Sequence, residues 1–311
     1  MQCDKIYRLP ISRPRPSVAP ETRRVVNLMK EIARWIEDSG YSSFLGAELV
    51  EIDSENARLR LPWNPGNSNP GEVLHGGCAA SLGILGGQAV ARAALGPEAG
   101  GFHTAQLQVA YLAAAQNEEV TAEARLLRRG KTLCFVRIDV ATLGGKPIAS
   151  ILTTVRGRCG ETPARTPAHG GDHRESDPSE IGGFIEQQPF IANRKLRIEH
   201  MTGGTSRLSM PFSDEHNGDA EGGVHEGAVA ALLDTCGAMA AWAESGIGPY
   251  RASTVSLQSE SLAPAPAEDL VAYGRCTHRD GDMFWADVDI TVASTSNLIG
   301  RGTVLYRIVT A

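Results

Sequence analysis

Two stretches of the chain, GEVLHGGCAASL at 71–82 and EGGVHEGAVAALL at 221–233, each place a histidine before a run of alanine, glycine and leucine. The two histidines, His75 and His225, are 150 positions apart. Shifting the chain by the same distance superimposes two further pairs of segments, QLQVAYL (106–112) on SLQSESL (256–262) and RRGKTLCFVRIDV (128–140) on HRDGDMFWADVDI (278–290). Self-similarity at one fixed distance predicts two tandem copies of one domain.

The bulk composition is that of a soluble globular chain. Its 311 residues suit two domains of ordinary size, and 42% are hydrophobic and 21% charged. No apolar run reaches the roughly eighteen residues of a membrane span, so we expect no membrane association. Residues 1–20 carry arginine and proline where a secretory signal would be apolar, which predicts a cytoplasmic protein. The formal net charge of −6 argues against a nucleic-acid partner.

The six cysteines predict reduced thiols. They are scattered, with no C-x-x-C pair and no histidine beside them at metal-ligand spacing. Cys78 and Cys236 fall in helical runs of small residues, where we interpret them as buried small hydrophobes rather than nucleophiles. We therefore expect no metal and no cofactor.

Composition divides the chain into an N-terminal tail at 1–20, a first domain with a preceding helix at 21–158, a linker at 159–183 and a second domain at 184–311. The linker is rich in glycine, proline and charge and lacks apolar periodicity. We attribute its two histidines, His169 and His173, to a solvated surface segment rather than to a metal site. The preceding helix, 21–40, has an apolar face and Gly40 as its stop signal.

Each copy is predicted to be an α+β unit in which an antiparallel sheet wraps one buried helix. In the first copy the apolar run from Gly77 to Leu95 is long enough for that helix. Three glycines inside the run each cost about 1 kcal/mol of helix propensity, so tertiary burial must hold it. Strand patterns occur at 44–53, 57–63, 104–114, 119–127, 133–142 and 147–157. The second copy repeats the order, with its helix from Gly227 to about Glu244.

This order of elements, with a loop ending in H-G-G and an acid nine positions after a histidine, resembles the hot-dog fold and most closely its PaaI-like acyl-CoA thioesterase branch. The resemblance covers roughly residues 41–157 and 190–310. It implies two tandem hot-dog domains whose long helices lie antiparallel against a continuous sheet, forming an intramolecular pseudo-dimer. It also implies an acyl-CoA substrate, with coenzyme A as part of the substrate, and a homodimer of the double hot-dog chain.

The family pattern is divided between the two copies. The first has Asn69, six positions before His75, and then Gly76 and Gly77, but it has Ile84 where the family has its acid. The second copy has its acid, Asp234, nine positions after His225. Its loop differs, since Asp219 replaces the asparagine and Glu226 the first glycine.

Because the family shares each site across its dimer, the resemblance implies one complete site per chain. The first copy would supply the asparagine, the histidine and the two glycines. The second copy would supply Asp234 and a downstream hydroxyl, either Ser253 or Thr254. The reciprocal pairing, with Ile84 facing Glu226, is expected to be inactive.

Each of these groups has a chemical reason to be there. The first N–H groups of a helix lack internal partners and lie at the positive end of its dipole, so Gly76 and Gly77 can donate to a thioester carbonyl. Asp234 is costly to bury in an apolar helix, which makes it a candidate general base or nucleophile, or else a structural acceptor at the domain interface. We assign His75 a positioning role only. Asn69 orients the water or the carbonyl, or is an ordinary turn residue.

Two other functions stay open from the sequence. A non-catalytic acyl-CoA-binding or sensing protein is the main alternative, because one half lacks its acid. A hydratase or dehydratase ranks last, since no aspartate and histidine are paired at the spacing of those enzymes. Arg128, Arg129 and Lys131 could meet the phosphates of coenzyme A, although a solvated hairpin explains them equally well.

Overall fold

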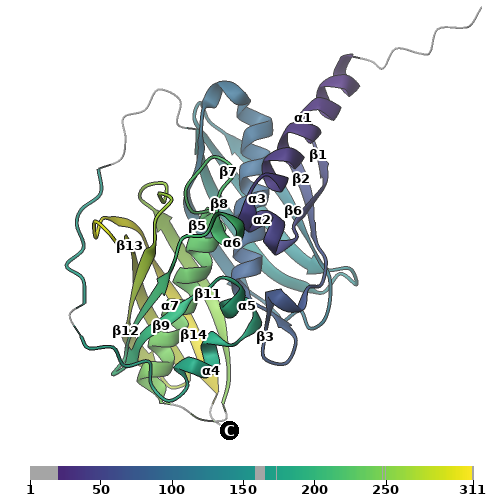
Figure 1. Cartoon of the computed structure of the whole chain (residues 1–311). Coiled ribbons are helices and arrows are strands. Elements are labelled where there is room, and N and C mark those ends of the chain that lie inside the picture. Colours follow the sequence, from purple (N-terminus) through teal and green to yellow (C-terminus); the bar gives the residue numbers. More distant parts are fainter. Residues whose placement is uncertain (1–19, 158–164, 173, 247, 249, 310–311) are drawn as a thin grey trace, which may run out of the picture.

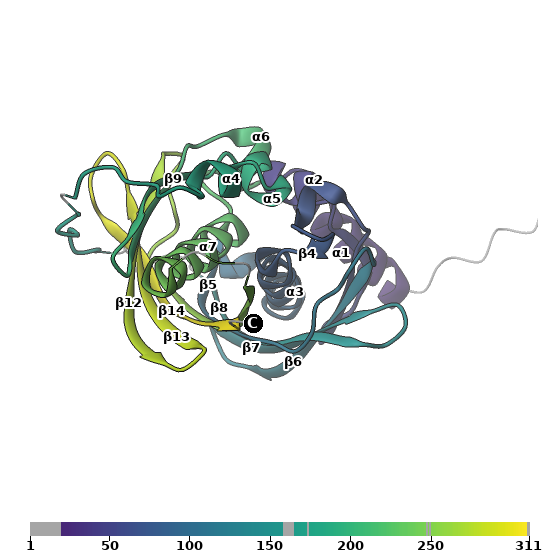
Figure 2. The ribbon, with the colours of Figure 1, turned by 90° about the horizontal axis from the view of Figure 1, so that it is seen from below.

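A twelve-stranded antiparallel sheet curves around two long helices, α3 (Gly76–Leu95) and α7 (Glu226–Ser245), in the computed structural model (Figures 1 and 2). The structure describes residues 20–157, 165–172, 174–246, 248 and 250–309. Figure 2 looks nearly along the helices and shows them side by side, each inside its own half of the sheet. This is the predicted architecture.

The order of the strands reveals the duplication. The sheet runs β1-β2-β6-β7-β8-β5 through the first half and β11-β14-β13-β12-β10-β9 through the second, so the second half mirrors the first. The bounds in the first half are β1 (Glu48–Ile52), β2 (Asn56–Leu61), β5 (Phe102–Tyr111), β6 (Val120–Arg129), β7 (Leu133–Thr142) and β8 (Pro147–Gly157). Those in the second half are β9 (Arg197–Thr202), β10 (Thr205–Met210), β11 (Arg251–Ser261), β12 (Leu270–Asp280), β13 (Met283–Val292) and β14 (Leu298–Val309).

The two halves join through β5 and β11. Gln108 faces Gln258 in this antiparallel pair, and these are equivalent residues of the repeat. A pseudo-twofold axis therefore passes between them. Because the hydrogen bonding continues across the junction, both halves share one sheet.

The glycines within α3 allow the helix to lie close to the sheet. A Cβ atom on Gly83 would lie 2.8 Å from the Ile151 side chain, and one on Gly86 would lie 3.1 Å from Ala124. Close packing thus offsets their poor helix propensity. The helix has the length and hydropathy of a membrane span, but 78% of that window is buried inside the protein, which makes it the core helix of its half.

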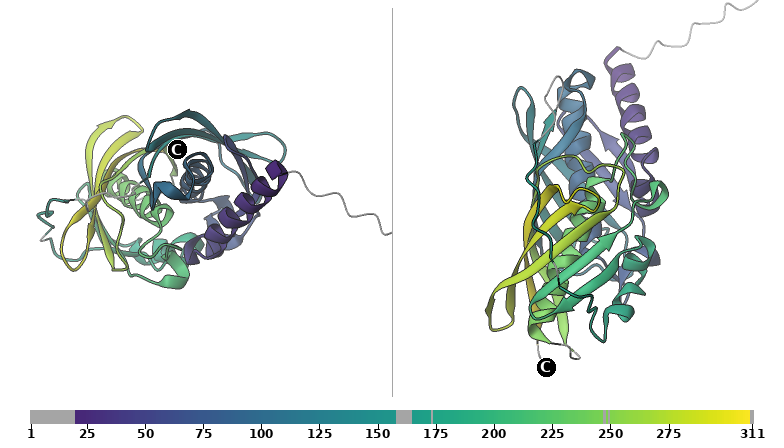
Figure 3. Two further views of the ribbon diagram at one scale, coloured as in Figure 1. Left: turned by 90° about the horizontal axis from the view of Figure 1, so that it is seen from above. Right: turned by 60° about the vertical axis from the view of Figure 1, so that its left-hand side comes forward.

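Two predicted boundaries near the N-terminus are wrong. Helix α1 (Pro20–Glu37), which lies along the outside of the first half (Figure 3), ends before Gly40, and Gly40 begins a further helix, α2 (Gly40–Leu45). The strand expected from residue 44 therefore starts only at Glu48. The cause is local capping: the Ser39 hydroxyl accepts a hydrogen bond from the Ser42 amide, which restarts the helix.

Short helices from each half cover the helix start of the other half. Tyr41 of α2 stacks on His225 with ring centroids 4.9 Å apart, and Phe190 of α5 (Pro189–Asn193) stacks on His75 at 3.7 Å. Arg194, only 1% exposed, follows α5 and donates to the Asn67 side chain at 2.8 Å. The exchange interlocks the halves and fixes the loops before α3 and α7.

The described part of the linker packs on the second half before α4 (Gly182–Glu186). His169 stacks on Tyr273 at 4.6 Å, and Ala168 forms a bridge with Asn297. His173 lies outside the described residues. Among the residues that the structure describes, no three potential metal ligands gather. The cysteines within those residues, Cys78, Cys134, Cys236 and Cys276, are free thiols.

Candidate active site

The start of α3 and the acid of α7 meet at the interface of the two halves. A Cβ atom built on Gly76 would lie 2.9 Å from Asp234 Oδ2. Gly76 is the first residue of α3, and His75 is its N-cap. Asp234 lies in the third turn of α7, and the packing of the two helices brings its carboxylate to the start of α3. The structure therefore brings together the two residues on which the predicted composite site depends.

Burial makes the Asp234 carboxyl a weaker acid than an ordinary aspartate. Its residue is 3% exposed, and this desolvation raises the pKa from 3.8 to about 6. The Thr254 hydroxyl donates to Asp234 Oδ1 at 2.8 Å, which acts in the opposite direction by favouring the charged form. At neutral pH the group is an ionised carboxylate that is more basic than an ordinary aspartate.

Thr254, and not Ser253, is the hydroxyl at this site. Both were candidates from the sequence. The two residues are adjacent in β11, so their side chains point to opposite faces of the sheet, and Ser253 is exposed. The expected substrate-binding role of Ser253 is corrected accordingly.

Tyr111 also lies at the centre, although the sequence did not predict it. Its hydroxyl donates to the Gly76 carbonyl at 3.1 Å. Its ring carbons Cε1 and Cζ lie 3.3 and 3.4 Å from the Cβ position of Gly76. Burial raises the pKa of the phenol, and the charge of Asp234 raises it further, so Tyr111 stays neutral. One signal in the sequence could have indicated it: when the repeats are superimposed, Tyr111 falls on Ser261, so the two halves differ at this position.

His75 and Gly77 serve the helix start rather than a substrate. His75 Nδ1 accepts a hydrogen bond from the Gly77 amide at 2.9 Å, so this amide is unavailable to a substrate carbonyl, which corrects the expected role of Gly77. A Cβ atom on Gly77 would lie 2.7 Å from Ala231, so the glycine lets α3 approach α7. Burial and the nearby Arg194 lower the pKa of His75 to about 3, so the ring is neutral and positions the backbone.

Asn69 is not joined to the other predicted residues. It lies half-buried in the short strand β3 (Ser68–Asn69), and the structure gives it no hydrogen bond to Asp234 or Thr254. The buried asparagine of this loop is Asn67, whose carbonyl accepts from the His75 amide at 2.9 Å. Asn217 does the same for His225 at 2.8 Å, so the repeat itself marks this position.

The basic residues considered for coenzyme A lie on the hairpin between β6 and β7. Arg128, Arg129 and Lys131 are all exposed there. Their surroundings are those of a solvated hairpin, and nothing in their contacts distinguishes a phosphate site.

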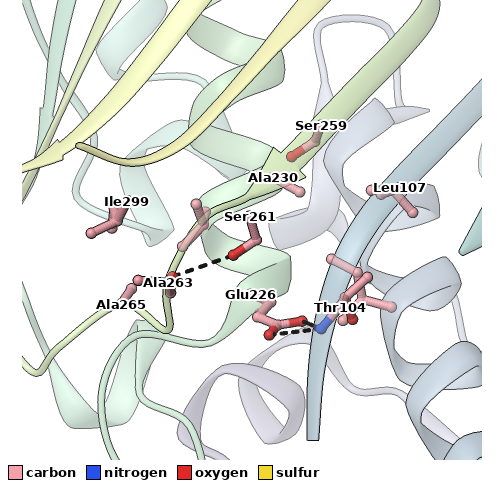
Figure 4. Close-up of a pocket in the computed structure, with 11 residues that line it drawn as sticks. Thr104, Leu107, Glu226, Ala230, Ser259, Ser261, Ala263, Ala265 and Ile299 are labelled. Atoms are coloured by element: carbon pink, nitrogen blue, oxygen red, sulfur yellow. Dashed lines mark hydrogen bonds between the residues drawn. The ribbon is translucent and has the colours of Figure 1, made fainter. Parts of the chain in front are cut away.

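The reciprocal centre is occupied by its own glutamate (Figure 4). Glu226 replaces the glycine, and its carboxylate accepts hydrogen bonds from His103 Nδ1 at 2.8 Å, from Gln88 Nε2 at 2.8 Å and from the Thr104 amide at 3.0 Å. Figure 4 shows the bond from Thr104. Burial alone would raise the pKa of Glu226, but the bonds from His103 and Thr104 outweigh it and hold the pKa below its ordinary value. Glu226 is therefore a fixed anion at the start of α7.

A fixed anion at a helix start opposes the chemistry expected there. It repels a developing oxyanion, and its donors already use its lone pairs. The cavity beside Glu226 is lined mainly by apolar side chains, with Ile84 at the position equivalent to Asp234. The second centre thus lacks both the free helix start and the opposing acid.

Two protein families match the halves of the chain in order. Residues 64–156 match the acyl-CoA thioesterase N-terminal domain, and residues 221–297 match the thioesterase superfamily. A Halobacterium salinarum protein named "putative esterase" is 36% identical over 115 residues, which are 36% of this chain and 76% of that protein. The chain belongs to the thioesterase superfamily. Its enzyme class, thioester hydrolase, is the predicted one.

Solved structures match this thioesterase over most of its length. A tesB protein of Mycobacterium avium subsp. paratuberculosis has a TM-score of 0.61 at 12% identity, covering 91% of this chain and 99% of its own. An acyl-CoA thioesterase II, TesB2, of Mycobacterium marinum has a TM-score of 0.60 at 13% identity, with 89% and 97% covered. A hot-dog protein of Alicyclobacillus acidocaldarius has a TM-score of 0.63 at 16% identity, with 89% and 98% covered. These likenesses confirm the tandem hot-dog fold.

Proposed function

We propose that this thioesterase hydrolyses an acyl-CoA thioester at one composite centre per chain, formed by the start of α3 and Asp234. The observation that carries the proposal is the 2.9 Å separation between Asp234 Oδ2 and the Cβ position of Gly76. Because Gly76 has no side chain, the carboxylate lies directly against the helix start, so the Gly76 amide and the acid can act on the same bound group.

The chemistry follows from this arrangement. The thioester oxygen would accept a hydrogen bond from the Gly76 amide, at the positive end of the α3 dipole. Asp234 would then either remove a proton from an attacking water or attack the carbonyl carbon itself. In the first route the tetrahedral intermediate expels the coenzyme A thiolate, which takes up the proton. In the second route the thiolate leaves an acyl-aspartyl anhydride, which water hydrolyses to the acid.

A thiol-release assay over a panel of acyl-CoA thioesters tests the proposal. Release of free thiol by the wild-type chain is the expected result. Binding of acyl-CoA without any thiol release would support a binding or sensing protein instead. A cytoplasmic location and the pairing of two chains remain predictions, and the second is checked by light scattering.

Activity is expected to depend on the ionisation of Asp234. Since the carboxylate is the reactive form and burial raises its pKa to about 6, kcat/KM should be constant above pH 7 and fall tenfold per unit well below pH 6. An ordinary aspartate would keep full activity to a pH near 5. A kcat/KM profile between pH 4.5 and 8, with folding checked by circular dichroism at each pH, measures the midpoint. A midpoint near 4 would contradict the buried carboxylate as the active base or nucleophile.

Restoring the acid of the second centre alone is expected to add little activity. In Ile84→Asp the new carboxylate would face Glu226, which still covers the helix start with negative charge. We expect kcat per chain to change by less than about 1.5-fold, because an oxyanion cannot be stabilised there. Steady-state kinetics of Ile84→Asp in the Asp234→Asn background isolates the second centre. Substantial turnover in that double variant would refute the assignment of one working centre.

A further inference from the structure

We propose that Tyr111 is a positioning residue that, together with His75, holds the start of α3 in the orientation needed for hydrolysis. The proposal rests on the proposed function, because the orientation of the Gly76 amide matters only if a thioester carbonyl binds there. The Tyr111 hydroxyl has the positioning role. The Tyr111 ring lines the centre and shields Asp234 from water.

The peptide between Gly76 and Gly77 is held at both of its edges. On one edge the Tyr111 hydroxyl donates to the Gly76 carbonyl at 3.1 Å. On the other edge the Gly77 amide donates to His75 Nδ1 at 2.9 Å. Since a peptide unit is planar, two hydrogen bonds on opposite edges fix its plane. The first bond comes from β5 and the second from the N-cap, so the helix start is attached both to the sheet and to its own loop.

A glycine helix start needs such external attachment. Gly76 has no side chain to anchor it, and glycine has more backbone freedom than any other residue. A donor to a developing oxyanion is effective only when its direction is set before the reaction. The Gly76 amide belongs to the preceding peptide, and Tyr111 and His75 act on it by holding the next one, which restricts rotation of the Gly76 backbone.

The second half shows the arrangement without this attachment. The Gly227 amide still donates to His225 Nδ1 at 2.9 Å, so both halves have the bond from the second helix residue to the N-cap histidine. Ser261 stands where the first half has Tyr111, and its hydroxyl donates to the Ala263 carbonyl at 3.3 Å instead. Glu226 is anchored by its own carboxylate. The tyrosine therefore accompanies the glycine at the centre that keeps its acid.

Tyr111→Phe separates the hydroxyl from the ring. Losing the bond to the Gly76 carbonyl should lower kcat roughly five- to tenfold, the effect of about one net hydrogen bond, with KM changed less than about twofold. The pH midpoint of kcat/KM should stay where it is in the wild type, because the ring still buries Asp234. Besides Tyr111, the groups near that carboxylate are Thr254 and the neutral Tyr306.

Tyr111→Ser, which copies the second half, should reduce kcat further. It also removes the ring, so water reaches Asp234 and the pH midpoint should move toward lower pH. If Tyr111 were purely structural, both variants would have a lower melting temperature. Tyr111→Phe would then not lower kcat at an unchanged pH midpoint, and Tyr111→Ser would not shift that midpoint.

Ser261→Ala is the matched control, since it removes the hydroxyl at the equivalent position of the other half and should leave kcat and KM unchanged. All variants are assayed as full chains with the best acyl-CoA from the panel. Wild-type kcat in Tyr111→Phe, or a loss carried wholly by KM, overturns the positioning role while leaving the hydrolase in place. A wild-type chain that releases no thiol overturns the proposed function and this role together.

Discussion

Asp234→Asn is expected to lower kcat/KM for thioester hydrolysis by at least about 1000-fold, because the amide can neither accept a proton nor attack the carbonyl. The substitution preserves the size of the side chain, and Thr254 can still donate to the amide oxygen. The effect should therefore appear in kcat, with acyl-CoA binding largely retained. Steady-state kinetics together with calorimetric binding of a non-hydrolysable acyl-CoA analogue measures both.

The same variant should be at least as stable as the wild type at pH 7. The folded-state pKa of Asp234 is raised from 3.8 to about 6, so folding loses stability as pH rises from about 4 to 6, and this loss persists above pH 6. It amounts to at most about 3 kcal/mol, since one pKa unit corresponds to about 1.4 kcal/mol. Asparagine removes that penalty. A higher or equal melting temperature at pH 7, with the difference shrinking below pH 4, is the expected pattern. Wild-type turnover in this variant would refute the role of Asp234.

Gly76→Ala is expected to reduce kcat/KM by at least about 100-fold, comparable to the loss of an oxyanion donor. The new methyl group would lie 2.9 Å from Asp234 Oδ2 and 3.3 Å from the Tyr111 ring, so it would push the carboxylate away from the helix start. Alanine favours the helix more than glycine does, which limits any loss of stability. Loss of activity without loss of fold is the diagnostic combination, measured by kinetics and thermal unfolding.

Gly183→Ala provides the control for this substitution. Gly183 is also a helical glycine, but a Cβ atom there would meet no atom within 4 Å. Its activity should equal that of the wild type. If Gly76→Ala were as active as this control, the close approach of the Asp234 carboxylate to the helix start would have no catalytic meaning.

The repeat revealed the two tandem domains, and the family pattern pointed to Gly76 and Asp234, because these signals are local. A histidine before an apolar run marks a helix start, and an aspartate within such a run, Asp234, is visible without knowing what it touches. The resemblance to the hot-dog thioesterases, which share each site across a dimer, then implied that the helix of one half pairs with the loop of the other. These features required no contact between distant residues.

The remaining features depend on contacts that no local pattern contains. Helix α2 has a local N-cap in Ser39, but its packing also depends on Tyr41 stacking on His225 in the other half, a contact that the sequence near Gly40 does not show. The bond from the Gly77 amide to His75 depends on a side-chain rotamer, which spacing does not define. The partnership of Glu226 with His103 joins residues 123 positions apart.

Because both halves belong to one polypeptide, a substitution in one half does not have to occur in the other. In an assembly of two identical chains, every substitution appears twice, so an isoleucine at the acid position would disable both centres at once. Here Ile84 and Asp234 are encoded separately, although the junction of β5 with β11 keeps their halves in a twofold relationship. The second half can therefore hold a buried ionic contact, Glu226 with His103, at the place where the first half holds the proposed centre.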